Sequence, residues 1–485
     1  MKNIFSDTRI LDQNLRDKYF ISDDVMMENA AIALQTELEA FIKKSSINKG
    51  VLILCGGGDN GGDGLVLARR MQGLVEQRVC MLKEAKSASC VRQLQRAKAC
   101  GVKIFNSDFE QALNLAKESS VIIDCIFGSG FTGTLNKDFA DFFEQLNSII
   151  KENSIFVVAC DIPSAMELRA DVTVTMGALK TALFSDKAKD ICSKIVCAPL
   201  GLSAGFFEDC AALAPEAVLL EKSDLLLPER RLQNVHKGSF GHTAVISGEK
   251  PGAAIIASCA AVAFGSGLCT IVGKKELALS SQILAYGVMS SDEVPGGTTA
   301  VAVGMGLGRG SLKHGELFAY LLNHPKIPAV LDADILYCPR IKQLLDERPS
   351  GIVLTPHPKE AAALFEILGI GTYSVEEICN KRLELAKRFA ELYPKAVLVI
   401  KGAYSVIASG GGVFFAGEGC AALAKGGSGD VLSGLICALL AQGYTNLEAA
   451  KNAVLAHGIA SKNLESNSYA LSPFALIRAI ETIGF

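Results

Sequence analysis

The chain has 485 residues, of which 49% are hydrophobic and 20% are charged, and its formal net charge is −3. This composition excludes an intrinsically disordered protein. The small net charge provides no overall field that would attract nucleic acid or an anionic membrane. A chain of this length is expected to form two or three domains.

The 15 cysteines are scattered singly, without a Cys-x-x-Cys pair. This pattern predicts buried, reduced thiols in a cytoplasmic protein, not a zinc site. The first 19 residues contain no apolar core of signal-peptide length. Residues 251–273 are uncharged, but they are rich in Ala, Ser and Gly and are divided by Gly265-Ser266-Gly267. We interpret them as a buried helix, a turn and a strand, and we expect no membrane span.

Short apolar runs alternate with amphipathic segments along the chain, which is typical of an α/β fold with parallel sheets covered on both faces. In the first half these runs are 51–55, 121–127, 155–162 and 194–200. In the second half they are 243–247, 268–272, 299–304, 328–334, 351–355, 396–402 and 404–409. Residues 202–231 show no clear strand. We therefore place the boundary near 212–224, between a domain of residues 1–215 and a domain of residues 222–485.

A glycine-rich loop, GGGDNGGDG (56–64), follows the first apolar run and precedes a helix-like segment. Six glycines in nine residues allow backbone N–H groups to approach a ligand, and the start of a helix favours an anion such as phosphate. A flexible turn is the simpler interpretation, but it does not explain two aspartates and one asparagine among the glycines. The loop is therefore predicted to bind a ligand.

Two further runs of the first domain end in polar residues. Asp124 is followed by the loop 128–133, and Asp161 is followed by Ser164. Either aspartate could simply cap the next helix. However, ligands of open parallel sheets bind beyond the carboxyl ends of the strands. Three such ends with carboxylate or oxygen groups favour one common site.

The strongest pattern of the second domain is KGGSGD (425–430) at the start of an apolar helix. Glycine-rich backbone at a helix start forms an anion hole for a phosphoryl group, and Asp430 could take the proton of an attacking hydroxyl. The alternative is a helix-capping aspartate. Lys401–Ser405 forms a second loop of phosphate size, and His357 follows a strand between two prolines. Asp332 and Asp334 are two residues apart in extended chain, so both can face one ligand.

The first domain resembles NAD(P)H-hydrate epimerase domains. The motifs that carry the resemblance are MMENAA (26–31), GGGDNGGDG (56–64), DCIFGSGFTG (124–133), ACDIPSA (159–165) and TVTMGALK (173–180). It implies a Rossmann-like three-layer sandwich and a potassium ion held by Asn60, Asp124 and Ser164, with Asp161 as a catalytic residue that contacts the substrate. Hard oxygen ligands suit such a cation. The implied hydrate-binding residues are Asp59, Asn60, Gly61, Gly62, Asp63, Gly128, Ser129, Gly130, Phe131, Thr132, Gly133, Thr134 and Asp161.

The second domain resembles the ADP- or ATP-dependent NAD(P)H-hydrate dehydratases of the ribokinase-like superfamily. The motifs are HKGSFGH (236–242), PGAA (251–254), GMGLG (304–308), LDADIL (331–336), LTPHPKEAAAL (354–364), VLVIKGAYS (397–405) and GGSGDVLSG (426–434). Both resemblances on one chain are typical of the bifunctional repair enzymes of bacteria.

The resemblance implies that the second domain phosphorylates the C6 hydroxyl of the S hydrate with ADP and Mg²⁺, with Asp430 as the catalytic base, and that phosphate then leaves. The first domain would interconvert the R and S epimers. The implied nucleotide-binding residues are Lys401, Gly402, Ala403, Tyr404, Ser405 and Gly429. The implied hydrate-binding residues are Ala253, Gly306, His357 and Asp430.

The chain departs from the usual family residues at five positions, which are Asp59, Ala165, Met305, Lys359 and Ser405. A ribokinase-like kinase of a vitamin precursor, fused to a non-catalytic Rossmann-like binding module, is the alternative function. The expected partners are the hydrates of NADH and NADPH and the nucleotide ADP, with ATP as the other candidate donor. We expect a cytoplasmic homo-oligomer without a nucleic-acid or membrane partner.

Overall fold

The computed structural model describes residues 1–45, 49–106, 108–131, 133–210, 212–273, 285–310, 313–348, 350–464 and 469–484. The chain forms two compact units. The N-terminal unit is Asn3–Glu216, and the C-terminal unit is Ala217–Phe485 together with Met1–Lys2. The division between Glu216 and Ala217 lies within the segment in which we placed the boundary from the sequence.

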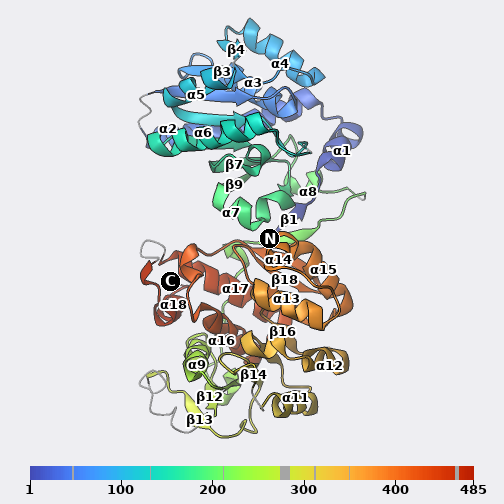
Figure 1. The fold of residues 1–485 in the computed structure, drawn as a ribbon, viewed down its shortest axis with the longest axis vertical. Coiled ribbons are helices and arrows are strands. Elements are labelled where there is room, and N and C mark those ends of the chain that lie inside the picture. Colours follow the sequence, from blue (N-terminus) through green and yellow to red (C-terminus); the bar gives the residue numbers. More distant parts are fainter. Residues whose placement is uncertain are drawn as a thin grey trace. The chain divides into compact units, whose positions relative to one another are not determined.

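The N-terminal unit is built around a parallel sheet with the strand order β4-β3-β2-β5-β6-β7-β9 (Figure 1). Its strands and helices are β1 (Lys2–Phe5), α1 (Arg9–Tyr19), α2 (Asp23–Lys44), β2 (Gly50–Cys55), α3 (Asp59–Met71), β3 (Gln77–Met81), α4 (Ala88–Ala99), β4 (Ile104–Asn106), α5 (Phe109–Lys117), β5 (Ser119–Cys125), α6 (Lys137–Asn153), β6 (Phe156–Cys160), β7 (Ala170–Met176), β8 (Leu179–Lys180), α7 (Asp186–Ile191), β9 (Cys192–Ala198) and α8 (Ala204–Phe207).

Alternation of side chains along the strands produces the two faces of this sheet. On β2, Val51 and Ile53 pack into a core that they share with α2, α3 and α4. Leu52 and Leu54 point the other way, into a core shared with α5 and α6. The unit is therefore a three-layer α/β sandwich. Because the strands are parallel, the loops after β2, β5 and β6 lie at one edge of the sheet, where ligands of such folds bind.

The C-terminal unit contains a larger mixed sheet with the strand order β13-β12-β11-β14-β15-β16-β17-β18-β19-β10. Its strands and helices are β10 (Ala217–Leu220), β11 (His242–Ile246), α9 (Pro251–Ala263), β12 (Leu268–Val272), β13 (Met289–Ser291), β14 (Ala300–Val303), α11 (Lys313–Asn323), β15 (Ala329–Leu331), α12 (Arg340–Glu347), β16 (Ile352–Leu354), α13 (Pro358–Ile367), α14 (Val375–Asn380), α15 (Arg382–Leu392), β17 (Val397–Ile400), β18 (Ser405–Ser409), β19 (Gly412–Ala416), α16 (Ser428–Ala441), α17 (Asn446–Lys462) and α18 (Pro473–Ile480).

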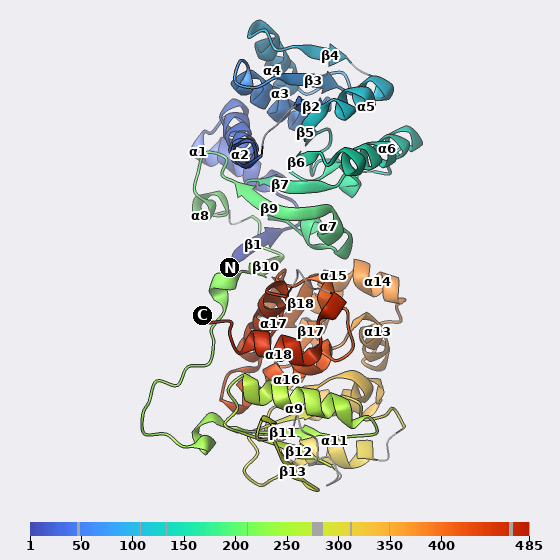
Figure 2. The same cartoon turned by 90° about the vertical axis from the view of Figure 1, so that its left-hand side faces the viewer.

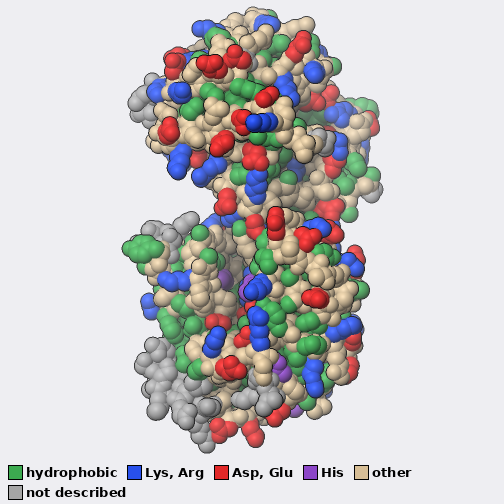
Figure 3. Space-filling view, viewed as in Figure 1, with side chains coloured by type: hydrophobic (Ala, Val, Ile, Leu, Met, Phe, Trp, Pro, Cys, Tyr) green, Lys and Arg blue, Asp and Glu red, His purple; other side chains and the backbone are tan. Residues whose placement is uncertain are grey.

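Helices cover both faces of this second sheet (Figure 2). The helices α9, α16, α17 and α18 share one core with alternate residues of β11, β12, β14, β15 and β16. Residues 251–273 form the expected helix, turn and strand, as α9 and β12. Within the described residues, no helix is long and apolar enough to span a bilayer. Acidic and basic side chains are interspersed over the face drawn in Figure 3, in agreement with the small net charge.

Three strands of the C-terminal unit differ from the sequence-based expectation. β18 pairs antiparallel with β17, whereas we expected parallel strands, and β19, which was not among the predicted runs, pairs antiparallel with β18. The reason is the connection between Ile400 and Ser405, which is too short for the crossover of a dozen or more residues that a parallel pair needs. β10 lies in the stretch 202–231, where the sequence showed no strand, and it pairs in parallel with β19.

Two candidate active sites

A cavity of about 700 Å³ opens at the carboxyl edge of the N-terminal sheet. The residues that line it include eight of those predicted to bind the ligand, which are Asp59, Asn60, Asp63, Gly128, Ser129, Gly130, Phe131 and Asp161. The structure therefore brings the loops after β2, β5 and β6 together around one space. Of the other predicted residues, Gly61, Gly62, Gly133 and Thr134 do not line the cavity. Thr132 lies outside the described residues.

The glycines after β2 allow the loop and the first turn of α3 to pack closely. A Cβ atom on Gly56 would lie 2.0 Å from the Ile126 carbonyl oxygen. A Cβ atom on Gly61 would lie 2.0 Å from the Gly56 carbonyl oxygen, and one on Gly62 would lie 2.9 Å from Cε of Met27. Real Cβ atoms do not approach so closely. Glycine at these positions therefore allows the loop that carries Asp59 and Asn60 to pack where it does.

The first prediction concerns Gly61. Gly61→Ala is expected to lower the free energy of unfolding by about 1–3 kcal/mol, because the added methyl group overlaps backbone at a packed position. Gly58→Ala is the matched control, since its Cβ atom would meet nothing within 4 Å and its φ of −95° suits alanine. Urea unfolding of the full-length variants measures the difference. Equal unfolding midpoints for the two variants would contradict the packing role of Gly61.

Asp161 lines the cavity and forms a buried ion pair with Lys180. Its Oδ1 atom lies 2.7 Å from Nζ of Lys180, and its Oδ2 atom accepts a hydrogen bond of 2.7 Å from the backbone N–H of Ser129. Burial by itself raises the pKa of Asp161, but the Lys180 ammonium and the hydrogen bonds from Lys180 and Ser129 bring the net pKa below its usual value. Asp161 is therefore an oriented carboxylate anion at neutral pH.

Asp124 and Ser164 do not line the cavity; both are fully buried and are joined by hydrogen bonds. The Ser164 hydroxyl and backbone N–H donate to the two carboxylate oxygens of Asp124 at 2.5 and 2.8 Å. Burial raises the pKa of Asp124 to about 6, although these hydrogen bonds oppose the shift. Asn60 lines the cavity, and both polar atoms of its carboxamide are buried without a hydrogen-bond partner among the described residues. A buried amide without a protein partner is compatible with a binding role.

Ala165 has a φ of +54°, in the left-handed region. Glycine adopts such angles without steric cost, whereas alanine does not. The chain therefore accepts some backbone strain directly after Ser164, which is bonded to Asp124.

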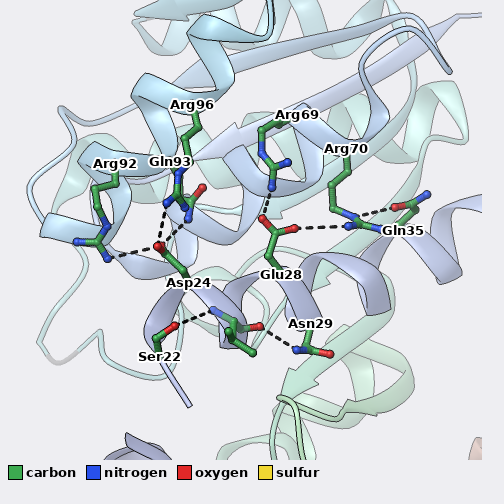
Figure 4. Close-up of polar contacts among 11 residues, drawn as sticks. Ser22, Asp24, Glu28, Asn29, Gln35, Arg69, Arg70, Arg92, Gln93 and Arg96 are labelled. Carbon is green, nitrogen blue, oxygen red and sulfur yellow. Dashed lines mark hydrogen bonds and ion pairs between the residues drawn. The ribbon is translucent and has the colours of Figure 1, made fainter. Parts of the chain in front are cut away.

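Helix α2 forms one wall of the cavity through Met26, Met27 and Ala30, and polar contacts attach it to α3 and α4 (Figure 4). Asp24 accepts a hydrogen bond of 2.9 Å from Arg96, and Glu28 pairs with Arg69 and Arg70. These pairs are partly exposed, so each contributes little stability. Their geometric effect is to fix the apolar face of α2 towards the cavity.

The C-terminal unit brings three predicted strand and helix ends together around Asp332. Lys401, after β17, donates to Oδ1 of Asp332 at 2.7 Å, and Ser433 of α16 donates to Oδ2 at 2.6 Å. A Cβ atom on Gly429 would lie 3.2 Å from Nζ of Lys401. The lysine ammonium therefore lies against the N-terminal end of α16, where backbone N–H groups also favour an anion.

Asp430 lies in the first turn of α16, two residues after the start of the helix at Ser428. Burial and the neighbouring carboxylate of Asp332 raise the pKa of Asp430 to about 6, and Lys401 opposes the shift. A carboxylate whose pKa lies near neutrality can take up a proton during a reaction and release it afterwards. This is the property required of the predicted base.

His357 is the N-cap residue of helix α13, and about half of its side chain is exposed to solvent. Its Nδ1 atom accepts hydrogen bonds from the backbone N–H groups of Lys359 and Glu360, so the ring proton is placed on Nε2, 3.1 Å from the Glu360 carboxylate. Burial and the Asp332 charge raise the pKa of Glu360 to about 7. The backbone of Lys250 connects Gly306 with Ala253. Its N–H group donates to the Gly306 carbonyl oxygen, and its carbonyl oxygen accepts from the N–H group of Ala253.

Comparison with known proteins decides the family. A model of the YjeF-related protein N-terminus matches residues 23–182, and a model of NAD(P)H-hydrate dehydratase matches residues 243–482. The bifunctional NAD(P)H-hydrate repair enzyme of Helicobacter pylori is 39% identical to the chain, with each protein covered over its full length. The chain belongs to the bifunctional NAD(P)H-hydrate repair enzymes.

A second relative, the repair enzyme of Coxiella burnetii, is 32% identical over 85% of each chain. The structure of the ADP/ATP-dependent NAD(P)H-hydrate dehydratase from Bacillus subtilis covers 56% of this chain and 99% of its own, with 26% identity and a TM-score of 0.47. Membership of the repair enzyme family confirms the predicted function class. The alternative of a vitamin-precursor kinase fused to a binding module is not favoured.

Several residues of this repair enzyme that the structure places at the sites were absent from the predicted set. In the N-terminal cavity these are Asp12 and Lys180, and the basic residues Arg9, Arg16, Lys83 and Lys86. Lys180 ends a motif that carried the family resemblance, which was a usable signal. Asp12 lies before the first of these motifs, so the sequence contained no signal that it belongs to the site. In the C-terminal unit, Asp332 was noted at a strand end but its bond to Lys401 was not foreseen.

Proposed function

We propose that the N-terminal unit interconverts the R and S hydrates of NADH and NADPH, and that the C-terminal unit dehydrates the S form with ADP as phosphoryl donor. This assignment rests on one carboxylate in each unit whose surroundings suit the proposed reaction. These carboxylates are Asp161 in the N-terminal unit and Asp430 in the C-terminal unit. Lys180 keeps Asp161 ionised, and an ionised carboxylate suits a group that exchanges a proton with each hydrate molecule. Asp430 has a pKa of about 6 and lies beside Lys401, which suits a base next to a phosphate site.

The dehydration that we propose uses phosphate as a leaving group in place of hydroxide. Asp430 removes the proton of the C6 hydroxyl, whose oxygen attacks the terminal phosphorus of ADP. The bond from that phosphorus to the bridging oxygen breaks, and AMP leaves. Elimination of the C6 phosphate, with loss of the C5 proton, then restores the C5–C6 double bond. Lys401 and the N-terminal end of α16 would stabilise the charge on the transferred group.

We propose the same ligand-binding residues that the sequence predicted. The nucleotide would bind Lys401, Gly402, Ala403, Tyr404, Ser405 and Gly429, with Mg²⁺ entering on its phosphate oxygens. The C-terminal hydrate would contact Ala253, Gly306, His357 and Asp430. The N-terminal hydrate would contact Asp59, Asn60, Gly61, Gly62, Asp63, the loop 128–134 and Asp161. Gly61, Gly62, Gly133 and Thr134 do not line the cavity, so they could contribute only through the position of their loops.

A potassium ion would draw on the oxygen atoms of three residues of the N-terminal unit, Asn60, Asp124 and Ser164. Asn60 has a buried carbonyl oxygen without a partner, and the Asp124 carboxylate and Ser164 hydroxyl supply further hard oxygen atoms. Burial raises the pKa of Asp124 to about 6, and a bound cation would favour its ionised form. The ion would order the loops around Asp161.

The function is tested on a mixture of R and S hydrates of NADH, which lack the 340 nm absorbance of NADH. With ADP and Mg²⁺, the full-length protein is expected to restore this absorbance for both epimers, and without nucleotide it is expected to restore none. A parallel assay with ATP identifies the preferred donor. Phosphorylation of a vitamin precursor without any recovery of absorbance would contradict the proposal and support the kinase alternative.

The cellular setting stays a prediction. All 15 cysteines are free thiols, which is typical of a reducing compartment such as the cytoplasm. The homo-oligomeric state is to be measured by size-exclusion chromatography with light scattering.

A further inference from the structure

Asp12 contributes a carboxyl group to the N-terminal cavity, which Asp59, Asp63 and Asp161 also line. It lies on α1, before the residues 23–182 that the family model matches. Together with Asp161 and Lys180 it lines the cavity. Among the described residues, no hydrogen bond or ion pair holds its carboxyl group, although the other acid contributed by this part of the chain, Asp23, is paired with Arg16 at 2.6 Å.

The surroundings of Asp12 and Asp161 place the two carboxyl groups in different charge states. Burial raises the pKa of Asp12 to about 6, with the Lys180 charge lowering it and the Asp161 charge raising it further. The pKa of Asp161 stays below its usual value because Lys180 pairs with it directly. Two carboxyl groups with separated pKa values in one cavity are the usual arrangement of an acid and a base.

Lys180 is not available as the proton donor. Its three N–H groups are directed at Oδ1 of Asp161, at the Met176 carbonyl oxygen and at the Thr175 hydroxyl, at 2.7, 2.9 and 3.1 Å. Its role is to orient Asp161 and to keep it ionised. A second proton-transfer group must therefore come from another side chain of the cavity.

We infer that Asp12 is a catalytic residue of the epimerase site and exchanges protons with the hydrate in concert with Asp161. This inference rests on the proposed epimerisation. The reaction needs two proton transfers, because C6 of the hydrate carries both a hydroxyl group and the ring nitrogen N1. A single carboxylate cannot exchange protons with the hydroxyl oxygen and with N1 at the same time.

The step balances as the opening and closing of this hemiaminal. One carboxylate takes the hydroxyl proton, the C6–O bond becomes a carbonyl, and the C6–N1 electron pair moves to N1, which accepts a proton from the other carboxyl group. Rotation about C5–C6 then presents the opposite face of the carbonyl. N1 returns its proton as it closes the ring, and the oxygen regains a proton. The products have the same atoms and oxidation state as the substrate, with the configuration of C6 inverted.

The test is the conversion of purified R hydrate to S hydrate by the full-length protein, followed by chromatography without nucleotide, so that the dehydratase is silent. Asp12→Asn keeps the shape of the side chain and is expected to lower this rate by about 10²–10⁴-fold, as loss of a positioned acid or base does. Asp12→Glu keeps the carboxyl group and is expected to recover part of the rate. Asp17→Asn, on the exposed part of the same helix, is the matched control and is expected to have the wild-type rate.

The outcomes separate this inference from the function on which it rests. Wild-type protein that does not exceed the spontaneous rate would refute the epimerase function itself. An active wild type with an Asp12→Asn rate within threefold of it would overturn the role of Asp12. Dehydration of S hydrate with ADP is measured on the same samples and is expected to be unchanged in Asp12→Asn, and thermal unfolding of the full-length variant tests whether the N-terminal unit is folded.

Discussion

Asp430→Asn is expected to lower the rate of ADP-dependent dehydration of S hydrate by about 10²–10⁴-fold while ADP still binds. The physical reason is that asparagine keeps the size of the side chain but cannot accept the proton of the C6 hydroxyl. The raised pKa of Asp430, about 6, reflects burial and the nearby Asp332 carboxylate, so removal of its charge relieves repulsion at the phosphate site. Nucleotide affinity is therefore expected to be retained or slightly increased. Single-turnover kinetics and calorimetric titration with ADP measure the two quantities.

Lys401→Ala is the contrasting variant for this experiment. It removes the ammonium group that lies against Gly429 and is expected to weaken ADP binding, whereas Asp430→Asn is not. Epimerisation, which is assigned to the other unit, is expected to continue in both variants. Turnover of Asp430→Asn above a third of the wild-type value would show that another group acts as the base.

Asp161→Asn is expected to reduce epimerisation to near its spontaneous rate, while S hydrate is repaired at the wild-type rate. The carboxylate is ionised and is fixed on two sides, by Lys180 and by the Ser129 N–H group. Asparagine preserves its shape but removes its charge and basicity, with an expected loss of about 10²–10⁴-fold. A time course on mixed epimers with ADP, separated by chromatography, measures both rates at once.

The control for Asp161 must account for the partner that the substitution leaves behind. Asp161→Asn buries the Lys180 ammonium without its counter-charge, and removal of one partner of a buried pair can cost about 3–5 kcal/mol. Thermal unfolding of the variant separates loss of the fold from loss of chemistry, and Asp141→Asn on the exposed face of α6 provides the reference. Equal loss of both epimers at wild-type speed would show that Asp161 is not needed. Slowed loss of S hydrate would mean that the two activities are coupled.

The local sequence determined the architecture and predicted the position of both candidate sites. Continuous Val, Ile and Leu runs such as VLILC (51–55) identified buried parallel strands, because a strand covered on both faces needs apolar residues on both. Glycine-rich loops and polar residues directly after these strands identified the binding edges. Asp161, Asp430 and Lys401 could be selected in this way because each lies within a few residues of a strand end or a helix start.

The tertiary structure decided which of these groups act on one another. Lys180 and Asp161 are 19 residues apart in the chain, and Asp332 and Lys401 are 69 apart, so no local pattern reveals either ion pair. Asp12 lies on a helix whose sequence is ordinary, and its carboxyl group matters only because α1 turns it towards a cavity built by later strands. The charge states follow from the same cause: burial and the distance to the nearest opposite charge set each pKa, and both quantities exist only once the chain has folded.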